Sequence, residues 1–158
     1  MEKYIQPFIE VCENVFHEFV GCDLSADRPY FEVKETINDW DISAVIGLTG
    51  EARGAVVISM KTSLAIRLTD ILSGSSHTDL DEEVVDAIGE IVNIIAGNVK
   101  KNLEESFRLI ISLPTIIQGK EHVIKWPTGQ ARIICIPFNI FENETFVLSV
   151  AIESIKGA

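Results

Sequence analysis

The sequence predicts an α+β fold in which long helices cover a largely antiparallel sheet. Two features of the chain lead to this prediction: β-type runs that follow one another as hairpins, and amphipathic segments of helical period before and between them. A chain of 158 residues can bury one sizeable core, and no linker rich in Pro, Gly or Ser divides it. We therefore expect a single domain over residues 1–158, in the order helix, three strands, two helices, then three or four strands.

The longest strongly periodic segment covers residues 78–105, TDLDEEVVDAIGEIVNIIAGNVKKNLEE. At about 100° per residue its apolar and polar side chains fall on opposite stripes, which predicts an amphipathic helix with one side on the core. Thr78 or Asp79 is expected as the N-cap, with Asp81 or Glu82 as its capping-box partner. The apolar stripe comprises Ile88, Ile91, Val92, Ile95, Val99 and Leu103. The polar stripe comprises Asp86, Glu90, Asn93, Gly97, Lys100, Lys101 and Glu104.

Shorter elements are expected on both sides of this helix. Gly21 and Gly74 are expected to end two further helices, because glycine is the usual residue after a helix. Gly50 and Gly54 are expected in the turn of a hairpin, and residues 22–29 in a loop. The further helices are expected over 3–20 and 62–72, and the strands over 30–37, 42–48, 55–60, 109–117, 121–126, 131–137 and 145–152.

Composition excludes several classes of function. The net charge of −11 argues against DNA or RNA as a partner, because the chain and a phosphate backbone repel each other. No apolar run approaches the roughly 20 residues that span a bilayer. The N-terminal segment is acidic and amphipathic, unlike a signal peptide with a basic start. We therefore expect a cytoplasmic protein that contacts no membrane.

Cysteine and histidine give no sign of a metal or redox site. The three cysteines form no CxxC pair, so reduced thiols are expected, with Cys12 and Cys135 packed in the core. The three histidines are far apart and have no carboxylate or cysteine at ligand spacing. His17 is expected at the surface or at the edge of the core, His77 at the surface, and His122 at the start of a strand. No Ser or Cys stands in a setting that would activate it as a nucleophile.

Glu90 and Asn93 on the polar stripe are neighbours, because residues three apart share a helix face. Gly97 follows one turn later, where alanine would favour the helix by about 1 kcal/mol, so a small residue there suggests close approach by another molecule. A solvated helix face is the alternative interpretation, and periodicity alone favours it. A second Glu-x-x-Asn match, Glu35 to Asn38, falls in a strand-to-loop region where such residues do not share a face, so we treat it as chance.

Residues 86–98, DAIGEIVNIIAGN, resemble the signature helix of the CheX, CheC and FliY phosphatases of bacterial chemotaxis. The active pair of that family is Glu-x-x-Asn, usually with Asp or Ser four residues before the Glu, which matches Glu90, Asn93 and Asp86 here. The similarity covers nearly the whole chain, since YIQPFIEVCENVF, ISAVIGLTGEARGAVVISM and SLPTIIQGK resemble other parts of the family. A single well-placed pair is closest to CheX, because CheC resembles a doubled version with two active helices.

The resemblance implies a phosphatase that hydrolyses the aspartyl phosphate of a CheY-type response regulator, in chemotaxis or another two-component pathway. It implies that Asn93 positions the attacking water and that Glu90 docks against the active-site lysine of the regulator. No cofactor is expected on this chain, since the regulator supplies its own Mg²⁺. A homodimer is also implied, and apolar strand runs at either end of the chain would leave a free sheet edge for pairing.

Helix geometry adds four hypothetical partner contacts. Asp86 would extend the contact of Glu90, Gly97 would permit close approach, and Lys100 and Lys101 would touch acidic partner surface. Two other functions stay open: a non-catalytic binding module of the same fold that holds a receiver domain, as in the flagellar switch, and a structural domain whose polar stripe is only solvated.

Overall fold

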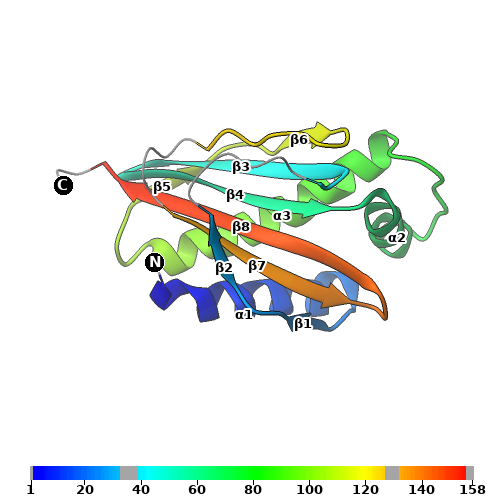
Figure 1. Ribbon diagram of the computed structural model, residues 1–158, viewed down its shortest axis with the longest axis horizontal. Helices are drawn as coiled ribbons and strands as arrows, with labels where there is room; N and C mark the ends of the chain where they lie inside the picture. Colours follow the sequence, from blue (N-terminus) through cyan, green and yellow to red (C-terminus); the bar gives the residue numbers. More distant parts are fainter. Residues whose placement is uncertain (1, 33–38, 127–131, 156–158) are drawn as a thin grey trace.

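The computed structural model of the chain describes residues 2–32, 39–126 and 132–155. In chain order its elements are the 3₁₀ turn η1 (Glu2–Tyr4), α1 (Ile5–Val15), the π-helical turn η2 (Phe16–Val20), β1 (Leu24–Ala26), β2 (Tyr30–Glu32), β3 (Ile42–Gly50), β4 (Ala52–Met60), α2 (Thr62–Ser73), α3 (Glu82–Leu103), β5 (Leu109–Ile111), β6 (Thr115–Gln118), β7 (Ile133–Ile140) and β8 (Glu144–Ser154). The strands form one eight-stranded antiparallel sheet, and α1 and α3 pack on the same face of it (Figure 1). The predicted α+β fold is confirmed.

The sheet is organised around four long strands in the order β7-β8-β4-β3. At one edge β1 and β2 pair with successive parts of β7, and at the other edge β5 and β6 pair with successive parts of β3. Both edges therefore consist of short strands, which limits edge-to-edge pairing with other chains. The expectation of free edges at both chain ends is wrong for the C-terminal run, because β8 lies inside the sheet between β7 and β4.

The main core lies between the sheet and the helical layer of α1, η2 and α3. Phe16 of η2 stacks on Phe146 of β8 with ring centroids 4.9 Å apart, and Phe146 stacks on Phe138 of β7 at 5.2 Å. All three rings are fully buried, and burial of such a side chain is worth about 1.5–3 kcal/mol. These aromatic contacts hold the N-terminal helix against the C-terminal hairpin.

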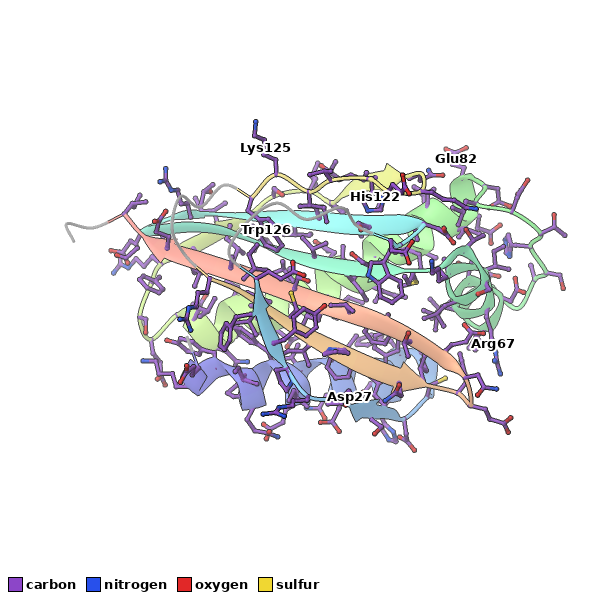
Figure 2. The ribbon with its side chains drawn as sticks, viewed as in Figure 1. Asp27, Arg67, Glu82, His122, Lys125 and Trp126 are labelled. Carbon is purple, nitrogen blue, oxygen red and sulfur yellow. The ribbon has the colours of Figure 1, made fainter. Side chains whose placement is uncertain are left out.

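The opposite face of the sheet is covered by the segment that follows β6. Ile124 and Trp126 of this segment pack against Ala55 and Val57 of β4. Figure 2 shows Trp126 over this face, while Lys125 points away from it. Residues 121–126 were expected to form a strand, but they show only an isolated bridge, because a segment that crosses the face of a sheet finds no continuous backbone ladder.

Close approach of two strands, rather than a turn, explains Gly54. The structure places it inside β4, opposite Ile152 of β8, and not in the β3–β4 turn as expected. A Cβ at this position would collide with the carbonyl oxygen of Ala151, so only glycine lets the two backbones pack here.

Two further strand predictions change in the structure. Residues 24–26, expected in a loop, form β1 because the exposed edge of β7 offers them backbone partners. The expected strand over 109–117 is split into β5 and β6. Residues 33–37 of the strand expected over 30–37, and the second Glu-x-x-Asn match at residues 35–38, lie outside the described residues.

The helix α3 begins later than predicted. Its N-cap is Asp81, whose Oδ1 accepts a hydrogen bond of 3.0 Å from the backbone N–H of Val84. Thr78 and Asp79 therefore do not cap it, and the capping box proposed around them is absent from the described helix start. These two residues belong instead to the loop that joins α2 to α3, and that loop is held by its own contacts.

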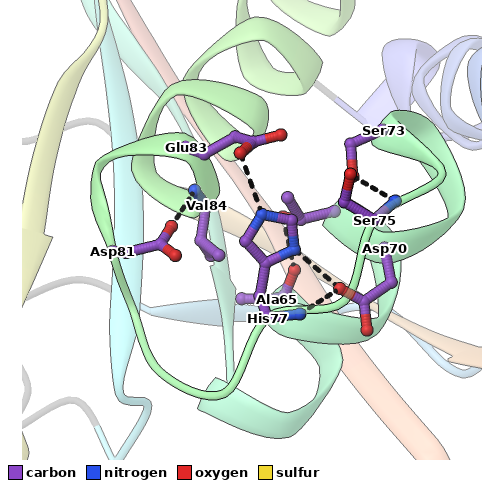
Figure 3. A network of polar contacts seen from close by, with 9 residues as sticks. Ala65, Asp70, Ser73, Ser75, His77, Asp81, Glu83 and Val84 are labelled. Carbon is purple, nitrogen blue, oxygen red and sulfur yellow. Dashed lines mark hydrogen bonds and ion pairs between the residues drawn. The ribbon is translucent and has the colours of Figure 1, made fainter.

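His77, expected at the surface, is instead the centre of the α2–α3 connection (Figure 3). Its Nδ1 lies 2.7 Å from Oδ1 of Asp70 on α2, and its Nε2 lies 3.1 Å from Oε2 of Glu83 in the first turn of α3. Its side chain is only 5 % exposed. Hydrogen bonds to Asp70 and then to Glu83 raise the pKa of His77 to about 8. The protonated imidazole thus ties the end of one helix to the start of the next.

The elevated pKa of His77 predicts a pH-dependent contribution to stability. Because the folded-state pKa lies above the ordinary value of 6.5, the stabilisation is fully present below pH 6.5 and is lost as the pH rises through about 8. Replacing His77→Gln should therefore lower the free energy of unfolding in urea more at pH 6.5 than at pH 9. His17→Gln is the control, since its contact with Asp23 is solvent-exposed and should contribute little at either pH. An equal loss for His77→Gln at both pH values would contradict the assignment.

Candidate functional site

The helix α3 is oriented by its apolar stripe. Each of the six stripe residues predicted from the sequence is at most 3 % exposed, as are Val84 and Ala96 of the same helix, and Gly89 is also buried. The polar stripe consequently faces outward: Asp86, Glu90 and Lys101 are exposed, while Asn93 and Gly97 are half-buried. The amphipathic orientation predicted from periodicity is confirmed.

Asp86, Glu90 and Asn93 line one open hollow of about 470 Å³, which we call the α3 hollow. Its other lining residues are Val85, Gly89, Leu113, Pro114 and Ile116. One wall is therefore the polar stripe, and the opposite wall is an apolar segment between β5 and β6. The structure brings together three sequence-predicted site residues and adds an apolar wall that the sequence analysis did not assign to the site.

The apolar wall exists because the chain breaks between β5 and β6. Pro114 removes a backbone donor, so the strand expected over 109–117 does not continue through it. The proline packs on α3 instead: a Cβ built on Gly89 would lie 3.5 Å from Cγ of Pro114, an ordinary contact distance. A proline within a β-type run was the sequence signal that could have revealed this break.

The functional groups of Glu90 and Asn93 are available to another molecule. Across residues 2–32, 39–126 and 132–155, neither side chain has a hydrogen-bond or ion-pair partner. By contrast, Asn98 on the next turn donates to the backbone carbonyl of Ile94. The lining of the α3 hollow carries two carboxylates, Asp86 and Glu90, and no cation. The hollow therefore attracts a cationic group and offers a free amide beside it.

The three remaining polar-stripe candidates lie along the helix beyond this hollow. Gly97 is open, with nothing within 4 Å of a Cβ built on it. Lys100 pairs with Glu104 at 3.7 Å, one helical turn later. Lys101 lines a different hollow, formed with the N-terminal residues Lys3 and Tyr4. None of the three lines the α3 hollow.

A buried serine, Ser43, and a half-buried histidine, His122, form another polar cluster. Nε2 of His122 lies 2.7 Å from Oγ of Ser43, and that hydroxyl lies 2.7 Å from Oγ of Ser59. His122 Nδ1 lies 2.7 Å from the carbonyl oxygen of Gly119, so Nδ1 donates there and Nε2 accepts from Ser43. The spacing is that of a nucleophile and its base. Ser43 is fully buried, however, so no substrate reaches it, and the cluster pairs buried hydroxyls across β3 and β4.

Cys12 and Cys135 are packed in the core, as expected. Cys12 and Cys135 are buried, and burial raises the pKa of both thiols, that of Cys135 to about 11. A thiol that stays protonated is a poor nucleophile. Among the described residues no group of three or more His, Cys, Asp or Glu side chains is placed to hold a metal ion. In that same part of the chain, no helix is both long and apolar enough to cross a bilayer.

Comparison with known proteins assigns the family. Residues 42–139, more than half of the chain, match the family described as chemotaxis phosphatase CheX. The chain belongs to the CheX family. A curated relative, the CheY-P phosphatase CheX of Thermotoga maritima, is 30 % identical over 112 residues, which cover 70 % of each protein.

Solved structures of CheX proteins share the fold. The chemotaxis protein CheX of Vibrio vulnificus superimposes with a TM-score of 0.83 at 29 % identity, over 96 % of this chain and 99 % of that one. The CheX of Borrelia burgdorferi, solved with CheY, BeF₃ and Mg²⁺, superimposes with a TM-score of 0.74 at 23 % identity, over 96 % and 98 % of the two chains. The resemblance inferred from the sequence is confirmed at the level of family and fold.

The open surroundings of Gly97 predict a gain in stability on substitution. Gly97→Ala should raise the free energy of unfolding by about 1 kcal/mol, because alanine favours the helix and its Cβ meets no neighbour. Gly54→Ala is the opposite case and should destabilise the fold, because its Cβ collides with the backbone of β8. Urea unfolding of the three proteins measures both effects. A destabilised Gly97→Ala would show that another constraint acts at this turn.

Proposed function

We propose that this CheX-family chain hydrolyses the aspartyl phosphate of a CheY-type receiver domain, with Asn93 positioning the attacking water. The observation that carries the proposal is the pair of side chains without a partner among the described residues, exposed Glu90 and half-buried Asn93, which line the α3 hollow together. The name of the Thermotoga maritima relative, a CheY-P phosphatase, supports the substrate class. The Borrelia burgdorferi structure shows the same fold in a complex with CheY.

The amide of Asn93 suits a hydrolysis that needs no covalent intermediate with this chain. The bond between the aspartyl oxygen and phosphorus of an acyl phosphate is labile, and phosphoryl transfer depends mainly on positioning and electrostatics. The carbonyl of Asn93 accepts a hydrogen bond from a water, and its NH₂ group donates one to an oxygen nearby. The water oxygen forms the new bond to phosphorus, the aspartate leaves as carboxylate, and the proton of the water passes to the released phosphate.

Glu90 and Asp86 supply the electrostatic part of the proposal. Their carboxylates share the α3 hollow with no cation, so they complement a positive group on the partner. We assign to Glu90 a contact with the active-site lysine of the receiver, and to Asp86 an extension of that contact. Gly97, Lys100 and Lys101 remain proposed partner contacts along the same helix.

The metal required for the reaction belongs to the receiver in this proposal. Mg²⁺ in the receiver site polarises the phosphoryl group. Two carboxylates line the α3 hollow, and among the described residues no third metal-ligating side chain lies with them. The residues of this chain therefore only bind, orient and hold water.

Two other expectations remain proposals. We retain a homodimer as the proposed assembly, although its geometry must differ from pairing through a free β8, because β8 is internal. The cytoplasmic location stays a prediction from the sequence.

Asn93→Ala tests the catalytic assignment. The variant should slow dephosphorylation of a phosphorylated CheY-type receiver by at least about 100-fold, because the water loses its in-line position. Its thermal midpoint should hardly change, since Asn93 is half-buried and bonds to no described residue. Asn102→Ala, on the same helix but lining the other hollow, is the matched control and should retain activity. Full activity in Asn93→Ala would rule out the mechanism.

Glu90→Lys tests the docking assignment. Reversing this charge should raise the receiver concentration for half-maximal rate at least about tenfold, because two positive groups then face each other. Glu105→Lys makes the same change in net charge two residues beyond the C-terminal end of α3 and should have little effect. Equal effects of the two variants would indicate only long-range charge and would contradict a specific contact.

The same assays separate the alternatives. A binding module would bind the phosphorylated receiver through Glu90 without accelerating its decay. A structural domain with a merely solvated polar stripe would neither bind nor respond to Glu90→Lys.

A further inference from the structure

Leu113 is the most exposed of the large apolar side chains in the described chain, at 85 %. It lies between β5 and β6, on the rim of the α3 hollow that Glu90 and Asn93 also line. Single exposed leucines are common and need no explanation by themselves. The surroundings of this leucine are what distinguish it.

The backbone around Leu113 is held by contacts on both sides. On one side, the N–H of Ser112 donates to the carbonyl oxygen of Gly47 at 2.9 Å, and the N–H of Gly47 donates to Oγ of Ser112 at 2.8 Å. The same hydroxyl donates to the carbonyl oxygen of Leu113 at 2.9 Å. On the other side, Pro114 packs against Gly89 of α3. The leucine is therefore presented to solvent by a braced segment.

The position of Leu113 gives the α3 hollow the composition of a protein-binding site. Pro114 and Ile116 continue its apolar surface into the hollow, opposite the carboxylates of Asp86 and Glu90. In a protein interface, packed contacts around a buried group exclude water from it, so an apolar side chain seated beside these carboxylates would shield them. Such exclusion strengthens the contact of a carboxylate with a cation.

We propose that Leu113 is a docking anchor that inserts into an apolar recess of the receiver domain, next to the cationic group that meets Glu90. This inference rests on the proposed function, because it names the partner of the same site. The lining of the hollow defines the partner surface that would fit it. Its two carboxylates, with no cation among the lining residues, favour a positive group, and its apolar wall favours an apolar recess beside that group. The seated leucine adds apolar contact area to the docked complex, and it shields the contact of Glu90 from bulk water on the side away from α3.

The test compares Leu113→Ala with Ile110→Ala. Ile110 is also a large exposed side chain, at 67 %, and it lies on β5 outside the lining of the α3 hollow. We expect Leu113→Ala to raise the receiver concentration for half-maximal rate about tenfold or more, as loss of a hot-spot side chain does. Its maximal rate should stay within about twofold of wild type, because Asn93 still positions water once the receiver is bound. Ile110→Ala should leave both quantities unchanged.

Direct binding separates failure of this proposal from failure of the proposed function. The probe is a CheY-type receiver loaded with beryllofluoride and Mg²⁺, titrated against wild type and both variants. If wild type binds the probe but does not accelerate phosphate loss, a tenfold weaker Leu113→Ala still supports the anchor while the phosphatase assignment fails. Unchanged affinity of Leu113→Ala, or equal weakening by Ile110→Ala, overturns the anchor. No binding by wild type overturns both proposals.

Discussion

Burial of the apolar stripe of α3 against the sheet is the constraint on which the rest of the site depends. Six side chains, each at most 3 % exposed, pack along one side of the helix. Burial of each is worth about 1.5–3 kcal/mol, so rotating α3 about its axis would cost about as much as the whole stability of a typical domain. The direction of Glu90 and Asn93 is therefore fixed by residues on the opposite side of the helix. A helix held in this way positions its side chains more accurately than a loop does.

The same packing fixes the second wall of the hollow. The β5–β6 segment is bonded to β3 through Ser112 and Gly47, and it contacts α3 through Pro114 and Gly89. Because β3 belongs to the sheet that buries α3, the same sheet holds both walls of the hollow in place. The distance between the polar stripe and the exposed leucine is thus set by the core rather than by the loop itself.

Accessibility separates the Ser43–His122 cluster from the Glu90–Asn93 pair. Ser43 and His122 have the spacing of a catalytic pair, yet the serine is fully buried and its hydrogen bonds are satisfied within the fold. Glu90 and Asn93 have the opposite properties, because they are accessible and lack partners in the described chain. Unsatisfied polar groups on an exposed, rigid surface are available for a partner, whereas satisfied buried groups stabilise the structure.

The order of β-type and helical runs along the chain determined the α+β class. Local periodicity determined the buried side of α3 and the position of Glu90 beside Asn93, because these depend on residues three or four apart on one helix. The sequence did not determine what lies opposite them. Three features are consequences of contacts between segments far apart in the chain: Leu113, Pro114 and Ile116 form the second wall, Gly54 faces β8, and His77 joins two helices. Tertiary packing decided these features, because local pattern carries no information about which distant segment will be the neighbour.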